Sequence, residues 1–413
     1  MNAPYLMTAV LLAVGVALGQ QTWKVNCQGG PGIDFTDLPQ AVAAAAPGDT
    51  IWVFTTPTGC PGMGAPPWYT ATTIDKPLNI LGFAIYSTTP PPGSGPTLAG
   101  LQGVVTINGI AAGERVVISG VAGATGLHMS NCAGEVVLEY LVRGASGQGN
   151  EVLTVQNCAE VTIHGGVILY GGTSLNITNS TVAISGLQMI STAPATTGGY
   201  SSTTPAITLT NSTLTITDSL IEGSWGYPGL PQHQPAVRLV DSTMYLGPGS
   251  NLFGGWALAG GWTTAYTSQS PVPSYVYLDP RTVTSGSSGS VTTIPQWIHA
   301  TYLDFAVAND WTTVTFAGPS NGFALLLLGD LPLQPTLTPF GSLNIDPNVM
   351  LIDFVALPGG SLLGFMTKDY FLPAAAQNAH AYSIQSLTLS PTGMLGLTMA
   401  TPFCVGWEHG RVP

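Results

Sequence analysis

Leu153-Thr154-Val155-Gln156-Asn157-Cys158 is the stretch that decides the fold, because close copies of it return along the chain. Each copy alternates apolar and polar residues, except that the last has Val240 at the second polar position, and then carries Asn or Asp followed by Cys or Ser. The copies begin at Leu127, Leu153, Leu175, Ile207 and Val237. Their Asn or Asp residues lie 26, 22, 32 and 30 residues apart, at Asn131, Asn157, Asn179, Asn211 and Asp241.

This repeat predicts a stack of β-strand rungs. Alternation with a period of two turns Leu, Val and Ile to one side and Ser, Thr and Asn to the other. A single rung cannot bury its apolar side, whereas stacked rungs bury a continuous column. A rung of about 22 residues with longer excursions therefore indicates a parallel β-helix. We expect the recurrent Asn and Asp241 to have a structural role, at bends where their side chains bond the neighbouring rung.

The rung spacing also predicts which side chains stack on the outside. Three positions before each Asn or Asp stand His128, Thr154, Asn176, Thr208 and Arg238. A second outward column is expected to hold Glu139, His164, Ser185 and Thr217. These columns are mostly neutral, whereas a catalytic face normally concentrates charge.

Cys132 and Cys158 occupy the same position in adjacent copies, so strand spacing would stack them about 4.8 Å apart. A disulfide or a stack of buried thiols would both fit that distance. We favour the stack, because the later copies carry Ser at this position and it therefore accepts a small residue.

The segment from Phe35 to Val53 predicts a capped helix that leads into a strand. Thr36 is the expected N-cap, the Ala-rich stretch favours helix, and Pro47-Gly48 is expected to end it. With Gly48-Asp49-Thr50 before the strand, this segment resembles the opening of pectin-lyase-like right-handed β-helix proteins. The resemblance covers roughly residues 22 to 283 and implies a right-handed solenoid whose end is plugged by an amphipathic helix.

The chain divides into three parts on these patterns. Residues 1–19 are expected to be a secretory signal peptide, because an apolar run ends in Ala17-Leu18-Gly19. Residues 20–296 form the predicted β-helix. Residues 297–413 read as short strands separated by Pro and Gly, at 313–316, 323–328, 350–355, 382–389 and 396–398. This last part resembles the small C-terminal β-sandwich of exported bacterial repeat proteins, which implies a role in stability, attachment or export.

Composition excludes several classes of function. Only 7% of the residues are charged and the net charge is −12, so no basic surface for nucleic acid is expected. No second apolar run is long enough to span a membrane.

In an exported chain Cys27 and Cys60 could pair in a disulfide. No CxxC spacing is present, so we expect neither a metal site nor a cofactor.

Catalytic patterns are weak. A lyase would need clustered carboxylates for Ca²⁺ beside a base such as Arg143 or Arg238, and no such cluster is evident. His164-Gly165-Gly166 is only a partial likeness to the Gly-His-Gly of related glycosidases. The best candidate catalytic residues are Asp218 and Glu222 on one rung, with Arg238 and Asp241 on the next.

Binding is better supported. Two long excursions, residues 191–203 and 222–234, follow the second strand of consecutive rungs and should emerge on the same side. Aromatic rings with nearby polar groups suit sugars, because ring faces stack on C–H groups. The candidate ligand-binding residues are Tyr200, Trp225, Tyr227 and His233.

The sequence therefore predicts a secreted or cell-surface β-helix protein without catalytic activity, acting in adhesion, surface structure or glycan binding. Its expected partner is an extracellular polysaccharide or a cell-surface glycan. The alternative is a polysaccharide lyase or glycoside hydrolase on the same scaffold, which rests on analogy of fold.

Overall fold

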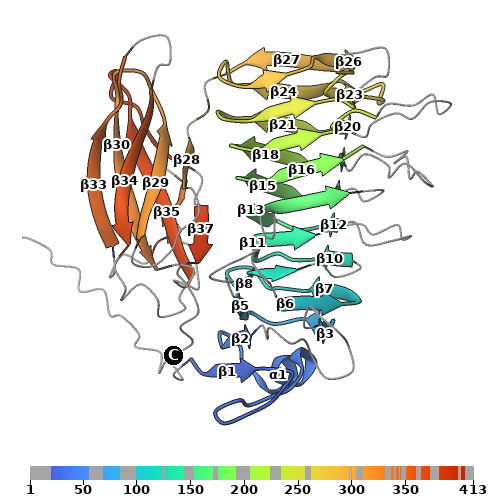
Figure 1. The fold of residues 1–413 in the computed structure, drawn as a ribbon. Coiled ribbons are helices and arrows are strands. Elements are labelled where there is room, and N and C mark those ends of the chain that lie inside the picture. Colours follow the sequence, from blue (N-terminus) through green and yellow to red (C-terminus); the bar gives the residue numbers. More distant parts are fainter. Residues whose placement is uncertain are drawn as a thin grey trace, which may run out of the picture.

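The computed structural model describes residues 20–54, 68–83, 99–122, 126–143, 153–170, 175–191, 205–223, 234–255, 262–296, 298, 300–303, 310–330, 336–338, 341–343, 345, 350–359, 364–372, 381–398 and 401–404. Within these ranges the regular structure is β-strand apart from helix α1 (Leu38–Ala44). The strands build a long solenoid and, beside it, a smaller sandwich (Figure 1). The expected signal peptide lies outside the described residues.

The solenoid has three parallel sheets, one on each side of its core, which confirms the predicted parallel β-helix. The first sheet contains β1 (Thr22–Val25), β2 (Thr50–Phe54), β5 (Asn79–Phe83), β8 (Arg115–Ser119), β11 (Glu135–Arg143), β13 (Glu160–Tyr170), β15 (Thr181–Ser185), β18 (Thr213–Thr217), β21 (Thr243–Leu246), β24 (Ser274–Leu278) and β27 (Val291–Pro295). The second contains β3 (Trp68–Thr70), β6 (Ala99–Gln102), β9 (Val121–Ala122), β16 (Gln188–Ser191), β19 (Leu220–Glu222), β22 (Asn251–Phe253) and β25 (Val283–Thr284). Strands β11 and β13 run through both of these sheets.

The third sheet carries the repeat that was recognised in the sequence. It contains β4 (Thr73–Ile74), β7 (Val104–Asn108), β10 (Gly126–Ser130), β12 (Leu153–Gln156), β14 (Leu175–Thr178), β17 (Ile207–Thr210), β20 (Val237–Val240), β23 (Tyr266–Ser268) and β26 (Ser287–Gly289). The register pairs His128, Thr154, Asn176, Thr208 and Arg238 in one column, as the rung spacing predicted. The apolar residues between them, such as Val155 and Leu209, are completely buried.

Helix α1 covers the first rung, as the resemblance implied, and buries Leu38, Ala41 and Val42 against the core. Its boundaries differ from the expected ones. The N-cap is Asp37 rather than Thr36, because the Asp37 carboxylate accepts a hydrogen bond from the backbone N–H of Leu38 at 2.8 Å. The helix ends at Ala44, before Pro47-Gly48.

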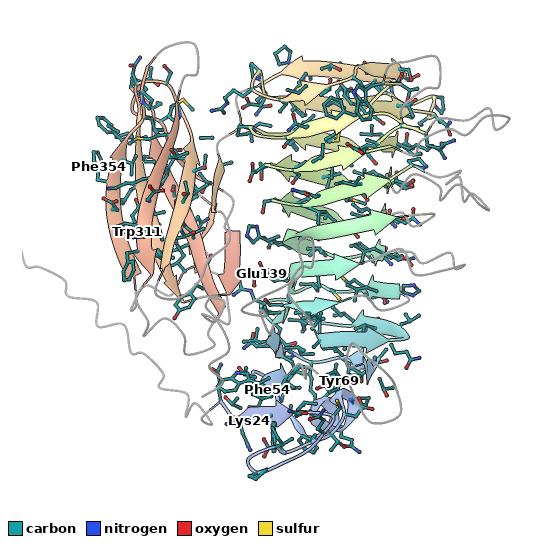
Figure 2. All side chains as sticks on the ribbon, in the orientation of Figure 1. Lys24, Phe54, Tyr69, Glu139, Trp311 and Phe354 are labelled. Atoms are coloured by element: carbon teal, nitrogen blue, oxygen red, sulfur yellow. The ribbon has the colours of Figure 1, made fainter. Side chains whose placement is uncertain are left out.

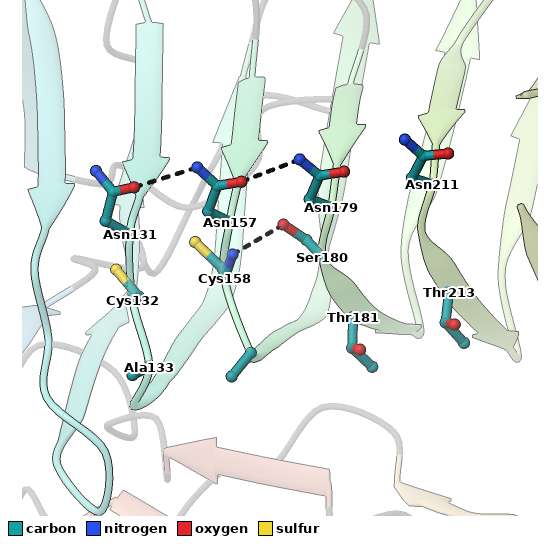
Figure 3. A pocket seen from close by; sticks show the side chains of 11 residues that line it. Asn131, Cys132, Ala133, Asn157, Cys158, Asn179, Ser180, Thr181, Asn211 and Thr213 are labelled. Carbon is teal, nitrogen blue, oxygen red and sulfur yellow. Dashed lines mark hydrogen bonds between the residues drawn. The ribbon is translucent and has the colours of Figure 1, made fainter. Parts of the chain in front are cut away.

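The bend between the third and first sheets holds two ladders of side chains. In the outer ladder the Asn residues adopt positive φ, which Asn tolerates better than most residues. Asn157 Nδ2 donates to Asn131 Oδ1 at 3.2 Å, and Asn179 Nδ2 donates to Asn157 Oδ1 at 3.1 Å (Figure 3). These hydrogen bonds between side-chain amides join successive rungs on the surface of the bend.

The inner ladder consists of the residues that follow each Asn or Asp. The Ser212 hydroxyl accepts from the backbone N–H of Ser180 at 3.1 Å and donates to the Thr210 carbonyl at 2.7 Å. Ser180 and Ser242 make the equivalent pair of bonds in their own rungs. Each hydroxyl therefore satisfies a buried backbone N–H of the preceding rung, where an unpaired group would be costly.

The C-terminal part is a sandwich of antiparallel sheets. One sheet contains β28 (Ala300–Leu303), β29 (Asp310–Ala317) and β34 (Phe365–Leu372). The other contains β33 (Met350–Ala356), β30 (Phe323–Asp330), β35 (Ala381–Leu389), β36 (Leu395–Leu397) and β37 (Thr401–Cys404), and β31 (Thr336–Thr338) pairs with β32 (Gly341–Leu343). The strand segments expected from the sequence coincide with β29, β30, β33, β35 and β36. Val314 and Phe316 from one sheet pack against Leu326 and Ile384 from the other.

The sandwich packs against the solenoid. Strand β37 contacts β11 and β13 of the first sheet. Between the two parts, Asp279 Oδ2 accepts from the backbone N–H of Ile298 at 2.8 Å, and Arg281 Nη2 donates to the Ile298 carbonyl at 3.0 Å. Asp279 and Arg281 also form a buried ion pair at 2.8 Å. This pair therefore holds the connecting segment to the solenoid.

Candidate functional site

The long excursions of the middle and later rungs leave the solenoid at one corner. After β9, β11, β13, β16, β19 and β22 the chain passes through residues outside the described ranges and then returns in the third sheet. Strands β16 and β19 are paired neighbours, and so are β17 and β20, to which the chain returns. The excursions at 192–204 and 224–233 therefore start and end on adjacent rungs, on the same side. We call this edge the loop corner.

The four candidate ligand-binding residues belong to these excursions. Tyr200, Trp225, Tyr227 and His233 lie outside the described residues, so their prediction stands as a prediction. What the structure describes is the base from which their segments rise.

An aromatic stack lies at this base. Phe253, at the end of β22, stacks on Trp262 with ring centroids 4.8 Å apart and planes inclined by 25°. Trp262 is 38% exposed, so part of the stack faces solvent. The sequence could have indicated it, because Asn251-Leu252-Phe253 is a further second-sheet strand after Leu220-Ile221-Glu222 and precedes a third excursion.

Glu222 lies beside this stack. It pairs in register with Phe253, and the backbone N–H of Gly223 donates to the Phe253 carbonyl at 2.8 Å. Burial raises the pKa of the Glu222 carboxyl. Gly223 has no room for a side chain, because a Cβ there would lie 2.1 Å from the Gln234 carbonyl oxygen. The two ends of the 224–233 excursion thus close tightly against each other.

Arg238 lies on β20 of the third sheet, shortly after Gln234 in the sequence. Its Nη2 donates to Gln234 Oε1 at 3.1 Å, while its Nε is buried without a hydrogen-bond partner in the described part of the chain. In register its neighbours are Thr208 and Thr267. A guanidinium placed here orients the Gln234 side chain at the loop corner.

Two of the candidate catalytic carboxylates, Asp218 and Asp241, are not brought together. Asp218 lies at the bend between the first and second sheets, in register with Gly165 and Gly186, and like them it has a positive φ. Asp241 lies at the opposite end of the first-sheet strands, in the Asn ladder, where it accepts from the Ser270 hydroxyl. Strands β18 and β21 separate them by roughly 16 Å, at about 3.3 Å per residue. Both aspartates therefore occupy bend positions that require a left-handed backbone.

The expected outward column of Glu139, His164, Ser185 and Thr217 is present, but another part of the chain covers it. The register stacks these residues as expected, but they are buried instead of exposed. Figure 2 shows Glu139 on the side of the solenoid that faces the sandwich, where β37 packs against β11 and β13. Glu139 accepts from the Ser119 hydroxyl at 2.7 Å, and His164 Nδ1 and the Ser185 hydroxyl are 2.8 Å apart. Burial lowers the pKa of His164 to about 4.

A second buried charged group was not anticipated from the sequence. Arg115 and Glu135 form an ion pair on neighbouring first-sheet strands, and Glu160 follows Glu135 in register. Burial and the nearby Glu135 raise the pKa of Glu160. Glu135 is thus engaged with Arg115 at the start of β11, whereas Arg143 ends that strand, so this group does not form the lyase arrangement considered above.

Three cysteines, Cys27, Cys132 and Cys158, lie in the described part of the solenoid. Cys27 is disulfide-bonded, and its expected partner Cys60 lies outside the described residues. Cys132 and Cys158 are buried free thiols, which confirms the thiol stack. Among the residues that the structure describes, no group of His, Cys, Asp or Glu could hold a metal ion, and no helix is long and apolar enough to cross a membrane.

The sandwich carries exposed aromatic residues away from the loop corner. Trp311 and Phe371 face each other edge to face at 5.6 Å, and Trp311 is 65% exposed (Figure 2). Phe323 and Phe354 stack at 4.9 Å.

No family model matches the chain, and a search of curated proteins finds no significant match.

Proposed function

We propose that this protein is an exported or cell-surface β-helix protein that binds glycans at the loop corner and does not cleave them. The observation that supports this most directly is the Phe253–Trp262 stack at the base of successive excursions. A partly exposed indole offers a flat face to sugar C–H groups, and Glu222, which pairs in register with Phe253, offers a polar partner beside it. Adhesion or a surface coat would be the setting for such contacts.

Export is part of this proposal. The apolar run at 6–19 and the Ala17-Leu18-Gly19 site support a cleaved signal peptide. The disulfide at Cys27 supports an oxidising compartment. N-terminal sequencing of the protein released by its host tests this, and a chain beginning at Gln20 is the expected result.

The binding test is a glycan array with the intact protein, followed by titration of any glycan that binds. Trp262→Ala and Trp225→Ala should each weaken binding by about tenfold, corresponding to roughly 1.4 kcal/mol. Trp311→Ala is the matched control, because it removes an equally large and more exposed indole from the sandwich. Equal losses in Trp311→Ala, or no loss in the loop-corner variants, would contradict the proposed site.

The alternative is a polysaccharide-active enzyme, and the raised pKa of Glu222 is the observation in its favour, since a general acid must be protonated at working pH. Each bound glycan should therefore also be assayed for new chain ends. Cleavage that is lost in Glu222→Gln would establish the enzyme. Loss in Asp218→Asn, Arg238→Ala or Asp241→Asn would place catalysis elsewhere on the solenoid.

A further inference from the structure

The inner ladder changes chemistry along the solenoid. In its first two rungs it carries Cys132 and Cys158, and in the next rungs Ser180, Ser212 and Ser242. The serine hydroxyls already make the bonds that this position requires, to the N–H of the preceding rung and to a carbonyl of their own rung. The thiols only approximate them, with Cys132 Sγ 3.3 Å from the Ser130 carbonyl and Cys158 Sγ 3.4 Å from that of Gln156. Packing and hydrogen bonding therefore do not explain why two adjacent rungs carry Cys.

The two cysteines occupy equivalent positions on adjacent rungs. Strands β10 and β12 pair Ser130 with Gln156, and the register continues through the bend, because the Ala159 N–H donates to the Cys132 carbonyl at 2.7 Å. Rungs in register are about 4.8 Å apart, which lies within the Cα separation of roughly 4.4–6.8 Å that disulfides span. A cross-link between these rungs would therefore need little movement of the backbone.

We propose that Cys132 and Cys158 form a redox-active pair that closes to a disulfide between adjacent rungs, so that the free thiols of the structure are its reduced state. The pair lines a surface groove of about 700 Å³ that runs along the bend between the third and first sheets (Figure 3). Asn131, Asn157 and Asn179 form one of its walls. This groove is the path by which a small oxidant would approach.

The environment of Cys132 favours attack. The interaction with the neighbouring Cys158 side chain lowers the pKa of Cys132 below its usual value, whereas the same interaction and burial raise the pKa of Cys158. The thiolate is the nucleophile in thiol–disulfide exchange. Cys132 is therefore assigned the attacking sulfur and Cys158 the resolving one.

The oxidant that we assign is a small-molecule disulfide, and the exchange balances in two steps. The Cys132 thiolate attacks one sulfur of that disulfide, forms a mixed disulfide and releases one thiolate. Cys158 then loses its proton and attacks Cys132 Sγ, which releases the second thiolate. Two protein thiols lose two electrons and two protons in total, and the external disulfide is reduced to two thiols.

The test uses the folded full chain and oxidised glutathione. After incubation, free thiols are alkylated under denaturing conditions and the protein is digested with trypsin without reduction. Trypsin cuts after Arg143, between the two cysteines, so a cross-link joins two peptides that are otherwise separate. We expect the linked pair, lighter by two hydrogens than the sum of its parts and separated by a reductant, together with a rise of several degrees in the melting temperature of the solenoid.

Cys132→Ser and Cys158→Ser are matched controls, because each restores the residue that later rungs carry at this position. We expect Cys158→Ser to retain one glutathione on Cys132, since the resolving thiol is gone, and neither variant to gain melting temperature on oxidation. Alkylation of both cysteines in the oxidant-treated wild-type protein would overturn the proposal. So would separate glutathione adducts on Cys132 and Cys158.

Discussion

At the scale of single residues, the backbone explains most of the polar positions that stand out in the sequence. Asn131, Asn157, Asn179, Asn211 and Asp241 all have φ near +50° at the same bend of successive rungs. Asp218 takes the left-handed conformation at another bend, where neighbouring rungs carry Gly165 and Gly186. These residues are present because short polar side chains tolerate a conformation that is costly for most others.

Replacement of Asp218 separates its backbone role from a catalytic one. Asp218→Gly should change the free energy of unfolding by less than about 1 kcal/mol, because Gly already serves this bend in two nearby rungs. Asp218→Val should lower it by about 1–2 kcal/mol, since a β-branched residue is strained at positive φ. Urea unfolding of the solenoid measures both. A larger loss for Gly than for Val would show that the carboxylate, not the backbone, matters.

His164 makes stability depend on pH. Its pKa is lowered from 6.5 to about 4 in the folded protein, first because it is buried. The unfolded chain then binds the proton more tightly, so this contribution is complete above pH 6.5 and is lost as the pH falls toward 4.

Between pH 7 and pH 4 the wild type should therefore lose about 3 kcal/mol more than His164→Gln, which cannot titrate. Urea unfolding at a series of pH values gives the difference. Parallel losses in the two proteins would mean that other groups dominate.

At the scale of elements, the solenoid depends on repeated bonds between rungs. The inner ladder satisfies backbone N–H groups that the parallel sheets leave unpaired at the bend, as Ser212 does for Ser180. Ser212→Ala should therefore lower the free energy of unfolding by about 1–3 kcal/mol, because it leaves the buried backbone N–H of Ser180 without its acceptor. Ser212→Cys is the control and should lower the free energy of unfolding by less. Cys158 already occupies the equivalent position of the inner ladder, in the rung before Ser180. Equal losses would assign the effect to packing.

Sequence alone predicts the elements whose pattern is periodic. The spacing from Asn131 to Asp241 sets the register of the third sheet, and that register is the one in the structure. The loop corner is only partly predictable, because Phe253 and Trp262 lie at the two ends of one excursion and no local motif indicates that their rings meet there. Asp218 and Asp241 look like neighbours in the sequence because adjacent rungs suggest proximity, whereas the length of β18 separates them.

The sequence indicates that the Glu139 column is buried, but the alternating pattern of most other first-sheet strands makes this indication easy to miss. Most first-sheet strands alternate, but Val116-Val117-Ile118 and Val136-Val137-Leu138 are continuous apolar runs. Such runs are typical of strands that are covered on both faces. Val117 and Val137 point away from the solenoid core and form a second buried cluster with Leu81. The runs therefore marked the face on which another part of the chain packs.

At the scale of the whole molecule, the sandwich and the solenoid meet on the first sheet, leaving the loop corner on another side of the solenoid (Figure 1). The joint depends on Asp279, which is fully buried and holds both Arg281 and the N–H of Ile298.

Asp279→Ala should release this joint. Removing one partner of a buried ion pair leaves Arg281 uncompensated, which typically costs about 3–5 kcal/mol. The solenoid core does not include Asp279, so the loss should be concentrated where the connecting segment leaves β27. Hydrogen exchange should accelerate around residues 296–300, and a protease should cut between the two parts sooner than in the wild type.

Asp369→Ala is the control, because it removes an exposed carboxylate that binds only the Thr313 hydroxyl among its described contacts. If both variants were cut at the wild-type rate, the Asp279–Arg281 pair would be a local feature of the β24–β25 bend, and the contact of β37 with β11 and β13 would be what holds the two parts together.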